Sequence, residues 1–78
     1  MIEVEKKTKA SGQRVVAEIV ERLQAEGLGR RIMGPLLQKR RGFRWRIVLR
    51  GDESPVPPVL SWMYGLSGVR VEPDPPSI

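Results

Sequence analysis

The sequence contains no cysteine and no histidine. Without cysteine there is no disulfide and no thiolate zinc site, and without histidine the usual imidazole ligand and the neutral-pH proton shuttle are also missing. We therefore expect no metal site and no cofactor.

Long apolar segments are also missing. The longest uncharged stretch, residues 54–69, is interrupted by three prolines and two glycines, so it is neither long nor apolar enough to span a bilayer. The first five residues lack the cationic start and apolar run of a signal peptide. These absences predict a soluble cytoplasmic protein with no membrane partner.

The chain has no recognisable catalytic arrangement. Its glycines are not followed by the Lys-Ser or Lys-Thr pair of a phosphate-binding loop. Its serines have no histidine base partner, and its carboxylates are scattered over the surfaces of the expected helices and strands. With 78 residues there is room for one domain, residues 1–78, with a thin core. We expect a binding module and not an enzyme.

Acidic residues are absent from the middle of the chain. The net charge is +5, but residues 28–50 hold eight basic residues and no acidic one, whereas the remainder holds six basic and nine acidic residues. A cationic patch on an otherwise acidic body favours an anionic partner and speeds its arrival. Nucleic acid is the partner that we expect; a charged face that only keeps the protein in solution is the alternative.

Hydrophobic spacing predicts a strand and a helix in the first third of the chain. Residues 2–5 alternate between apolar and acidic side chains, which is the period of a half-buried strand, and residues 6–12 read as its continuation and a loop. A helix follows from Gln13, with Ser11 as the N-cap and Gly27 as the C′ residue. Its inner stripe consists of Val16, Ile19, Val20 and Leu23.

A hairpin of two strands is predicted next. Residues 29–37 form a strand that we expect to be interrupted, bulged or at an edge near Pro35, because proline cannot donate a hydrogen bond to a sheet. Residues 38–42 suit the turn. The second strand covers residues 43–50, where apolar residues occupy every other position and arginines three of the positions between them.

A second helix and a last strand complete the pattern. Two prolines suit the first turn of a helix over residues 57–65, and residues 69–72 alternate as a strand that ends at the prolines of 73–76. The order strand, helix, strand, strand, helix, strand predicts an α+β fold of the split βαβ, ferredoxin-like type. In it, two helices cover one face of a four-stranded antiparallel sheet and leave the other face open.

The strand over residues 43–50 supplies the candidate binding site. Its apolar residues, Trp45 among them, point to the core, so that Arg44, Arg46 and Arg50 project from the open face. Arginine offers forked donors to phosphate and a plane on which bases stack. The adjacent turn adds Lys39, Arg40 and Arg41. The alternative is that these arginines form ion pairs with the glutamates of neighbouring strands, Glu3, Glu5 or Glu72.

Two aromatic residues of the second helix are candidate partner contacts. Trp62 and Tyr64 lie outside the apolar face of that helix, so either side chain can contact a base or a protein partner. A position at the edge of the core is the alternative explanation.

Three segments, in order, resemble the C-terminal domain of the primosomal protein N′ family, the bacterial replication restart helicases. They are the pair Gly34-Pro35, the run Gly42-Phe43-Arg44-Trp45 with aliphatic residues after it, which is similar to the family pattern G-Y-R-W, and the run Asp74-Pro75-Pro76-Ser77-Ile78, which is similar to its D-P-x-S. Pro73 stands where the family usually has an aliphatic residue.

The resemblance implies a fold like that of ribosomal protein S10. It also implies a role in recognising single-stranded and branched DNA at stalled forks during replication restart, and contacts with single-stranded DNA-binding protein. The helicase motor and the cysteine-rich zinc-binding insert of the family have no counterpart here, so neither ATP hydrolysis nor a metal is carried over.

Three functions follow as hypotheses. The first is a non-catalytic DNA-binding domain of a replication restart (primosome) helicase, which binds single-stranded or forked DNA by shape and charge. The second is a protein interaction module that docks on single-stranded DNA-binding protein or on the helicase body, with Trp62 and Tyr64 in the contact. The third, an RNA-binding protein, rests on analogy of fold.

Overall fold

The chain forms the six expected elements in the expected order. The computed structural model describes residues 1–72, so the predicted end of the last strand at residues 73–76, like the D-P-x-S segment, lies outside the described residues. The elements are β1 (Ile2–Lys6), α1 (Lys9–Ala25), β2 (Arg30–Gln38), β3 (Gly42–Leu49), α2 (Pro57–Tyr64) and β4 (Val69–Val71).

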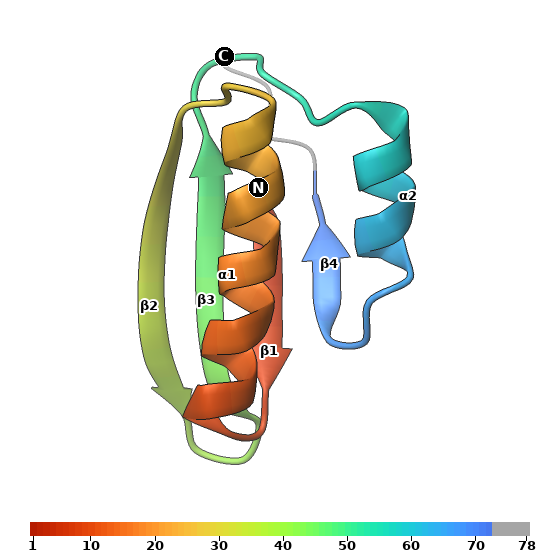
Figure 1. Ribbon diagram of the computed structural model, residues 1–78. Helices are drawn as coiled ribbons and strands as arrows, with labels where there is room; N and C mark the ends of the chain where they lie inside the picture. The colour runs from red at the N-terminus through yellow and green to blue at the C-terminus, as the bar shows by residue number, and fades with distance from the viewer. Residues whose placement is uncertain (73–78) are drawn as a thin grey trace.

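The four strands form one sheet in the order β2-β3-β1-β4. Every neighbouring pair is antiparallel. Helix α1 runs along the sheet over β1 and β3, and α2 stands beside β4 (Figure 1). Buried residues of both helices belong to the same core. The predicted α+β arrangement of the split βαβ type is therefore confirmed, with one sheet face left without a helix over it in residues 1–72.

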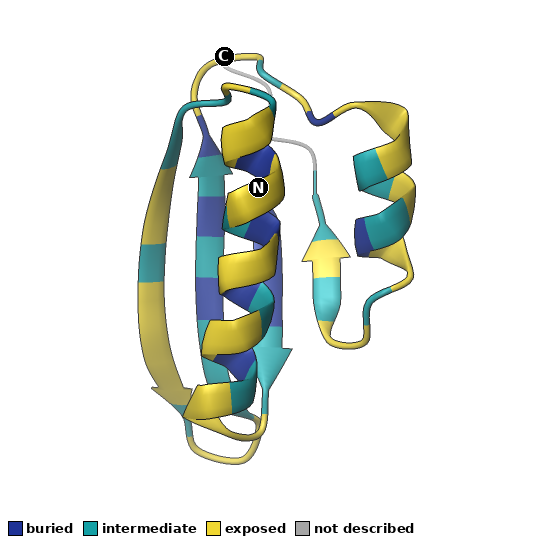
Figure 2. Cartoon of the chain, viewed as in Figure 1, coloured by how far each residue is buried: buried dark blue, intermediate teal, exposed yellow. Residues whose placement is uncertain are grey.

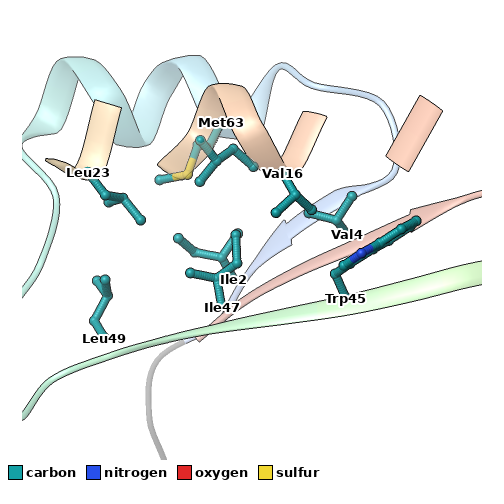
Figure 3. Packing of buried hydrophobic residues seen from close by; sticks show 9 residues of the cluster. Ile2, Val4, Val16, Leu23, Trp45, Ile47, Leu49 and Met63 are labelled. Carbon is teal, nitrogen blue, oxygen red and sulfur yellow. The ribbon is translucent and has the colours of Figure 1, made fainter. Parts of the chain in front are cut away.

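The core lies between the two helices and the central strands. The apolar stripe of helix α1 packs on the inward side chains of β1 and β3, and Met63 of α2 packs against the same cluster (Figure 3). Burial of these side chains is the main stabilising contribution in a domain of this size. The buried hydrophobic residues are Ile2, Val4, Val16, Ile19, Leu23, Trp45, Ile47, Leu49 and Met63.

Helix α1 starts earlier than the sequence pattern indicates. It begins at Lys9, and its N-cap is Thr8 and not Ser11. The Thr8 Oγ1 accepts a hydrogen bond from the backbone N–H of Ser11 over 3.2 Å, as an N-cap hydroxyl does. Gly12 therefore lies inside the helix, where it is buried. The predicted C′ residue is correct, since Gly27 has a φ of 72°.

The start of α2 is held by a side chain of α1. Its N-cap residue, Val56, has no side chain that caps the helix. Instead, the Oε1 of Glu26 accepts a hydrogen bond from the Val56 N–H over 2.7 Å. Glu53, in the loop between β3 and α2, forms a second such bond: its carboxylate accepts a hydrogen bond from the Gly29 N–H over 2.8 Å. These two bonds hold the loop between β3 and α2 against the segment that follows α1.

The Glu26 contact gives a first prediction. Glu26→Ala is expected to lower the free energy of unfolding by about 1 kcal/mol, because an orphan N–H at a helix start loses its acceptor. Glu26→Gln keeps an acceptor oxygen and should lose less than half as much. Urea unfolding followed by circular dichroism measures both. Equal losses in the two variants would show that the hydrogen bond is not what stabilises this junction.

Strand β2 lies at the edge of the sheet, and the expected interruption is present. Its pairing with β3 shifts register between Met33 and Leu36. Gly34 has a φ of 119° at this point, and a Cβ there would lie 2.6 Å from the backbone oxygen of Arg44, so only glycine fits. Figure 2 shows β2 mostly exposed, whereas β3 beside it alternates between partly buried and buried residues from Arg44 onward.

Candidate nucleic-acid interface

The pairing register defines which side chains share the sheet face opposite the helices, which we call the open face. On β3, Trp45, Ile47 and Leu49 are buried under the helices, so the alternate residues point the other way. Their register partners on β1, β2 and β4 point the same way. The charged members of the open face are Glu3, Glu5, Arg31, Arg44, Arg46 and Arg70.

Arg44 is already engaged within the protein. Its Nη1 lies 2.9 Å from the Oε1 of Glu3, and its Nη2 donates a hydrogen bond to the Oε1 of Gln38 over 3.0 Å. Its side chain keeps only 25% of its accessible surface. Among the candidate arginines Arg44, Arg46 and Arg50, Arg44 is thus the one that pairs with a glutamate of a neighbouring strand.

Glu3 is the centre of an ion-pair network. Its carboxylate, with a relative exposure of 6%, also lies 3.5 Å from the Nη2 of Arg70, and Arg70 in turn pairs with Glu72 over 3.0 Å. The hydrogen bond from Arg44 is the main cause that lowers the pKa of Glu3 below its usual value; burial acts in the opposite direction, and Arg70 lowers the pKa further. Glu3 is therefore a carboxylate at neutral pH.

Arg46 is different from Arg44. It lies directly opposite Glu3 in the register, yet it forms no ion pair and no hydrogen bond with any residue that the structure describes. Its Nε is buried without a hydrogen-bond partner among these residues. The charge of Arg46 is therefore available to an anion that approaches the open face.

Two further arginines lie at the same end of the open face. Arg31 pairs with Val48 in the register, next to Arg46 along the strand. Arg50 follows β3, and its guanidinium lies over Gly29, where a Cβ would be 3.1 Å from the Arg50 Nε. Arg31 and Arg50 are both exposed, and with Val48 they line one hollow of about 290 Å³. Arg31 and Arg50 thus share one hollow, and Arg46 lies diagonally across the register from Arg31 on the same face.

The turn between β2 and β3 carries charge at the opposite end. Lys39, Arg40 and Arg41 are all exposed. Arg41 also borders a second hollow of about 250 Å³, which it shares with Glu5 and Arg70. Predicted site residues therefore occupy both ends of the open face, and the Glu3 network separates them.

The aromatic candidates lie away from these arginines. Trp62 is half-buried, and the guanidinium of Arg22 stacks on its ring at 4.1 Å from the centroid. Tyr64 is 66% exposed on the same helix, on the helix side of the sheet. Within residues 1–72 the open face has no aromatic side chain, so arginine planes are what it offers to a base.

Sequence reasoning missed two contributors to the open face. Arg31 and Arg70 were not among the expected site residues. The alternation of Arg70 with two valines is a signal that places it on the open face. The position of Arg31 depends on how β2 pairs with β3 before the Gly34 interruption, which the sequence pattern does not specify.

No group of three or more His, Cys, Asp or Glu residues that could hold a metal ion occurs in residues 1–72. Neither of the two helices in that range has the length and apolar character needed to cross a membrane.

Comparison with known proteins does not place the chain in a family. No family model matches the sequence, and no curated protein and no solved structure matches it. The charge and geometry of the open face are therefore the main grounds for assigning a function.

Proposed function

We propose that this chain is a non-catalytic domain that binds single-stranded or branched DNA through the open face, in the cytoplasm. The observation that carries the proposal is the unpaired cationic end of that face. Arg46 has no anionic partner within residues 1–72. It lies diagonally across the register from the exposed Arg31, and the exposed Arg50 follows four residues later. Phosphate is the ligand that such a group of forked donors binds best.

The shape of the site favours a single strand. Alternate residues of a strand lie about 6.8 Å apart. Arg46 and the exposed Arg50 are four residues apart, so an extended backbone that follows β3 would meet them about 14 Å apart. The turn over residues 39–41 extends the cationic track past the other end of the face. Since bases have no aromatic platform there, binding is expected through backbone and charge, with little sequence preference.

The resemblance to the primosomal protein N′ family supports the same function. Of the three similar segments, Gly34-Pro35 forms the interruption of β2, and the run from Gly42 to Trp45 opens β3. Both lie at the open face or directly beside it. We therefore propose replication restart as the process, with stalled-fork DNA as the natural ligand and no ATP hydrolysis in this domain.

Fluorescence anisotropy with a labelled single-stranded oligonucleotide tests the proposal. Wild type is expected to bind with a slope near −2 in log affinity against log salt, for about three phosphate contacts. Arg31→Ala/Arg46→Ala should weaken binding about tenfold and reduce the slope by about 1.4. The control Lys9→Ala/Arg14→Ala removes two exposed charges from α1 and should change the affinity less than about twofold.

The outcomes separate the competing hypotheses. Equal losses in the test and control variants would show that net charge, and not the open face, attracts the strand. Tighter binding of RNA than of DNA with the same sequence would favour the RNA-binding hypothesis. No binding to single-stranded or forked DNA even at low salt would refute the proposed function.

A protein partner is the second candidate function. One observation favours it: three aliphatic side chains are exposed on β2, at Ile32, Leu36 and Leu37. Two of them lie on the helix side of the sheet and not on the open face. DNA binding and protein docking therefore use largely separate surfaces and are compatible with each other.

A further inference from the structure

Most of the exposed large hydrophobic residues in the described part of the chain lie on strand β2. Of the five exposed large hydrophobic residues in the described part of the chain, three lie on this one strand. Their exposed fractions are 43% for Ile32, 51% for Leu36 and 70% for Leu37. Single exposed aliphatic residues are normal on a protein surface, but a cluster on one edge strand marks an interaction site.

The position of α1 explains why these side chains are uncovered. Ile32 pairs with Ile47, and Leu37 pairs with Phe43, so both point to the helix side. Helix α1 lies over β3 and β1, and β2 stands outside its cover (Figure 1). The helix side of the sheet thus extends one strand, β2, beyond the area that α1 covers.

The backbone of β2 is open along the same edge. It is the outermost strand of the sheet, so alternate N–H and C=O groups point away from β3. The interruption at Gly34 and Pro35 breaks the edge into two paired runs, residues 30–33 and 36–38. Each run offers main-chain hydrogen bonds to an added strand, with an exposed aliphatic side chain beside them.

Charge decides which occupant fits this edge. The strand carries Arg30 and Arg31 at one end, and Lys39 and Arg40 follow its other end, without an acidic residue anywhere in 28–50. In an antiparallel pair of two copies, the arginines of one β2 would face the basic turn of the other, which is unfavourable. A nucleic acid is anionic, but it has no strand backbone to pair with the edge and no aliphatic groups to cover Leu37.

We propose that the free edge of β2 receives an extended segment of another protein, in which aliphatic residues alternate with aspartate or glutamate. The segment adds a fifth strand to the sheet. Its aliphatic side chains cover Ile32 and Leu37 on the helix side, and its carboxylates meet the basic residues at the two ends of the strand. Main-chain hydrogen bonds give the affinity, and the charges specify the partner.

Selection from a random dodecapeptide display library, with the full chain as bait, tests this inference. The enriched peptides should combine β-branched or leucine residues with aspartate or glutamate. One such peptide, synthesised with a fluorescent label, should bind the wild type and lose about tenfold or more in affinity to Ile32→Ser/Leu37→Ser, because two buried aliphatic contacts are removed.

A matched control removes the other two exposed hydrophobic residues. Val56→Ser/Tyr64→Ser takes away a similar apolar area on another surface and should leave the peptide affinity within about twofold. Amide hydrogen exchange should show new protection at β2 when the peptide is bound. The test and control variants both replace exposed side chains, so circular dichroism should show an intact fold for each.

Several outcomes would overturn the inference. They are the absence of any enriched peptide, enrichment of peptides without acidic residues, and binding that survives in Ile32→Ser/Leu37→Ser. A dimer of the wild-type chain in analytical ultracentrifugation that the same variant abolishes would make a second copy the occupant. The Ile32→Ser/Leu37→Ser variant should keep its affinity for single-stranded DNA, so failure here leaves the proposed function intact.

Discussion

Gly12→Ala is expected to lower the free energy of unfolding by about 2 kcal/mol, although alanine at a free helical position stabilises by about 1 kcal/mol relative to glycine. The reason is the side chain that lies against Gly12. A Cβ added at this residue would overlap the six-membered ring of Trp45. The ring is buried, with a relative exposure of 3%, so it has no free space into which it can move.

The measurement is chemical unfolding followed by circular dichroism. The neighbouring residue provides the control, because Gln13 is exposed on the same helix and Gln13→Ala adds no contact with the core. It should change the stability by less than about 0.5 kcal/mol. A Gly12→Ala variant that is more stable than the wild type would show that α1 does not depend on close contact with the ring.

A double-mutant cycle shows whether the ring is the cause. Trp45→Leu is destabilising by itself, since it removes buried apolar area. In that background, however, Gly12→Ala should cost less than half of what it costs in the wild type, because the ring that it overlaps is gone. An unchanged cost would place the strain elsewhere in the helix.

Glu3→Gln is expected to strengthen DNA binding about tenfold while it lowers the stability by about 1 kcal/mol. The substitution removes the negative charge in the middle of the open face. It also removes the ion pairs of Glu3 with Arg44 and Arg70, whose nitrogens lie 2.9 and 3.5 Å from the carboxylate. Each arginine that turns to a phosphate should steepen the salt slope by about 0.7.

Glu5 gives the matched control on the same strand and the same face. It forms no ion pair with the residues that the structure describes, so Glu5→Gln removes one negative charge without releasing an arginine. Its effect on affinity and on the salt slope should be clearly smaller. If the two variants behave alike, the arginines around Glu3 take no part in binding.

The same carboxylate predicts a pH dependence of stability. The pKa of Glu3 is lowered in the folded state, mainly by the Arg44 hydrogen bond, so the unfolded chain takes up this proton first as the pH falls. The stabilisation is therefore complete above the ordinary glutamate pKa and is lost on acidification through the lower folded pKa. Glu3→Gln should show less acid destabilisation than the wild type in thermal melts from pH 6 to pH 3.

Much of the fold was readable from local patterns. The alternation of residues 43–50, the proline in β2 and the two prolines at the start of α2 each dictate a local conformation that needs no distant contact. The start of α1 was predicted wrongly for the opposite reason. Glycine at position 12 is a poor helix former and indicated a loop, whereas the Thr8 cap starts the helix before it. The close approach of Trp45, 33 positions later, explains why the residue at this helical position is glycine.

The candidate site was less predictable than the fold. Alternation shows that Arg44 and Arg46 share a face, but not which of them is neutralised. Glu3 faces Arg46 in the register, yet its ion pair runs diagonally to Arg44. That choice depends on side-chain reach, on the twist of the sheet and on Arg70 from a third strand, and none of these is encoded in local sequence.

The central position of β1 also has a kinetic consequence. Ile2 pairs with Ile47 on one side and with Val71 on the other, so both ladders of this strand close very long loops. Among the strand pairs of residues 1–72, only the hairpin of β2 and β3 joins strands that are neighbours in sequence. Closing such loops costs chain entropy before the strand pairs of β1 with β3 and β4 can add to the stability of the fold. Folding should therefore wait for β1 to insert between β3 and β4, and this one slow event should assemble the core and the Glu3 network together.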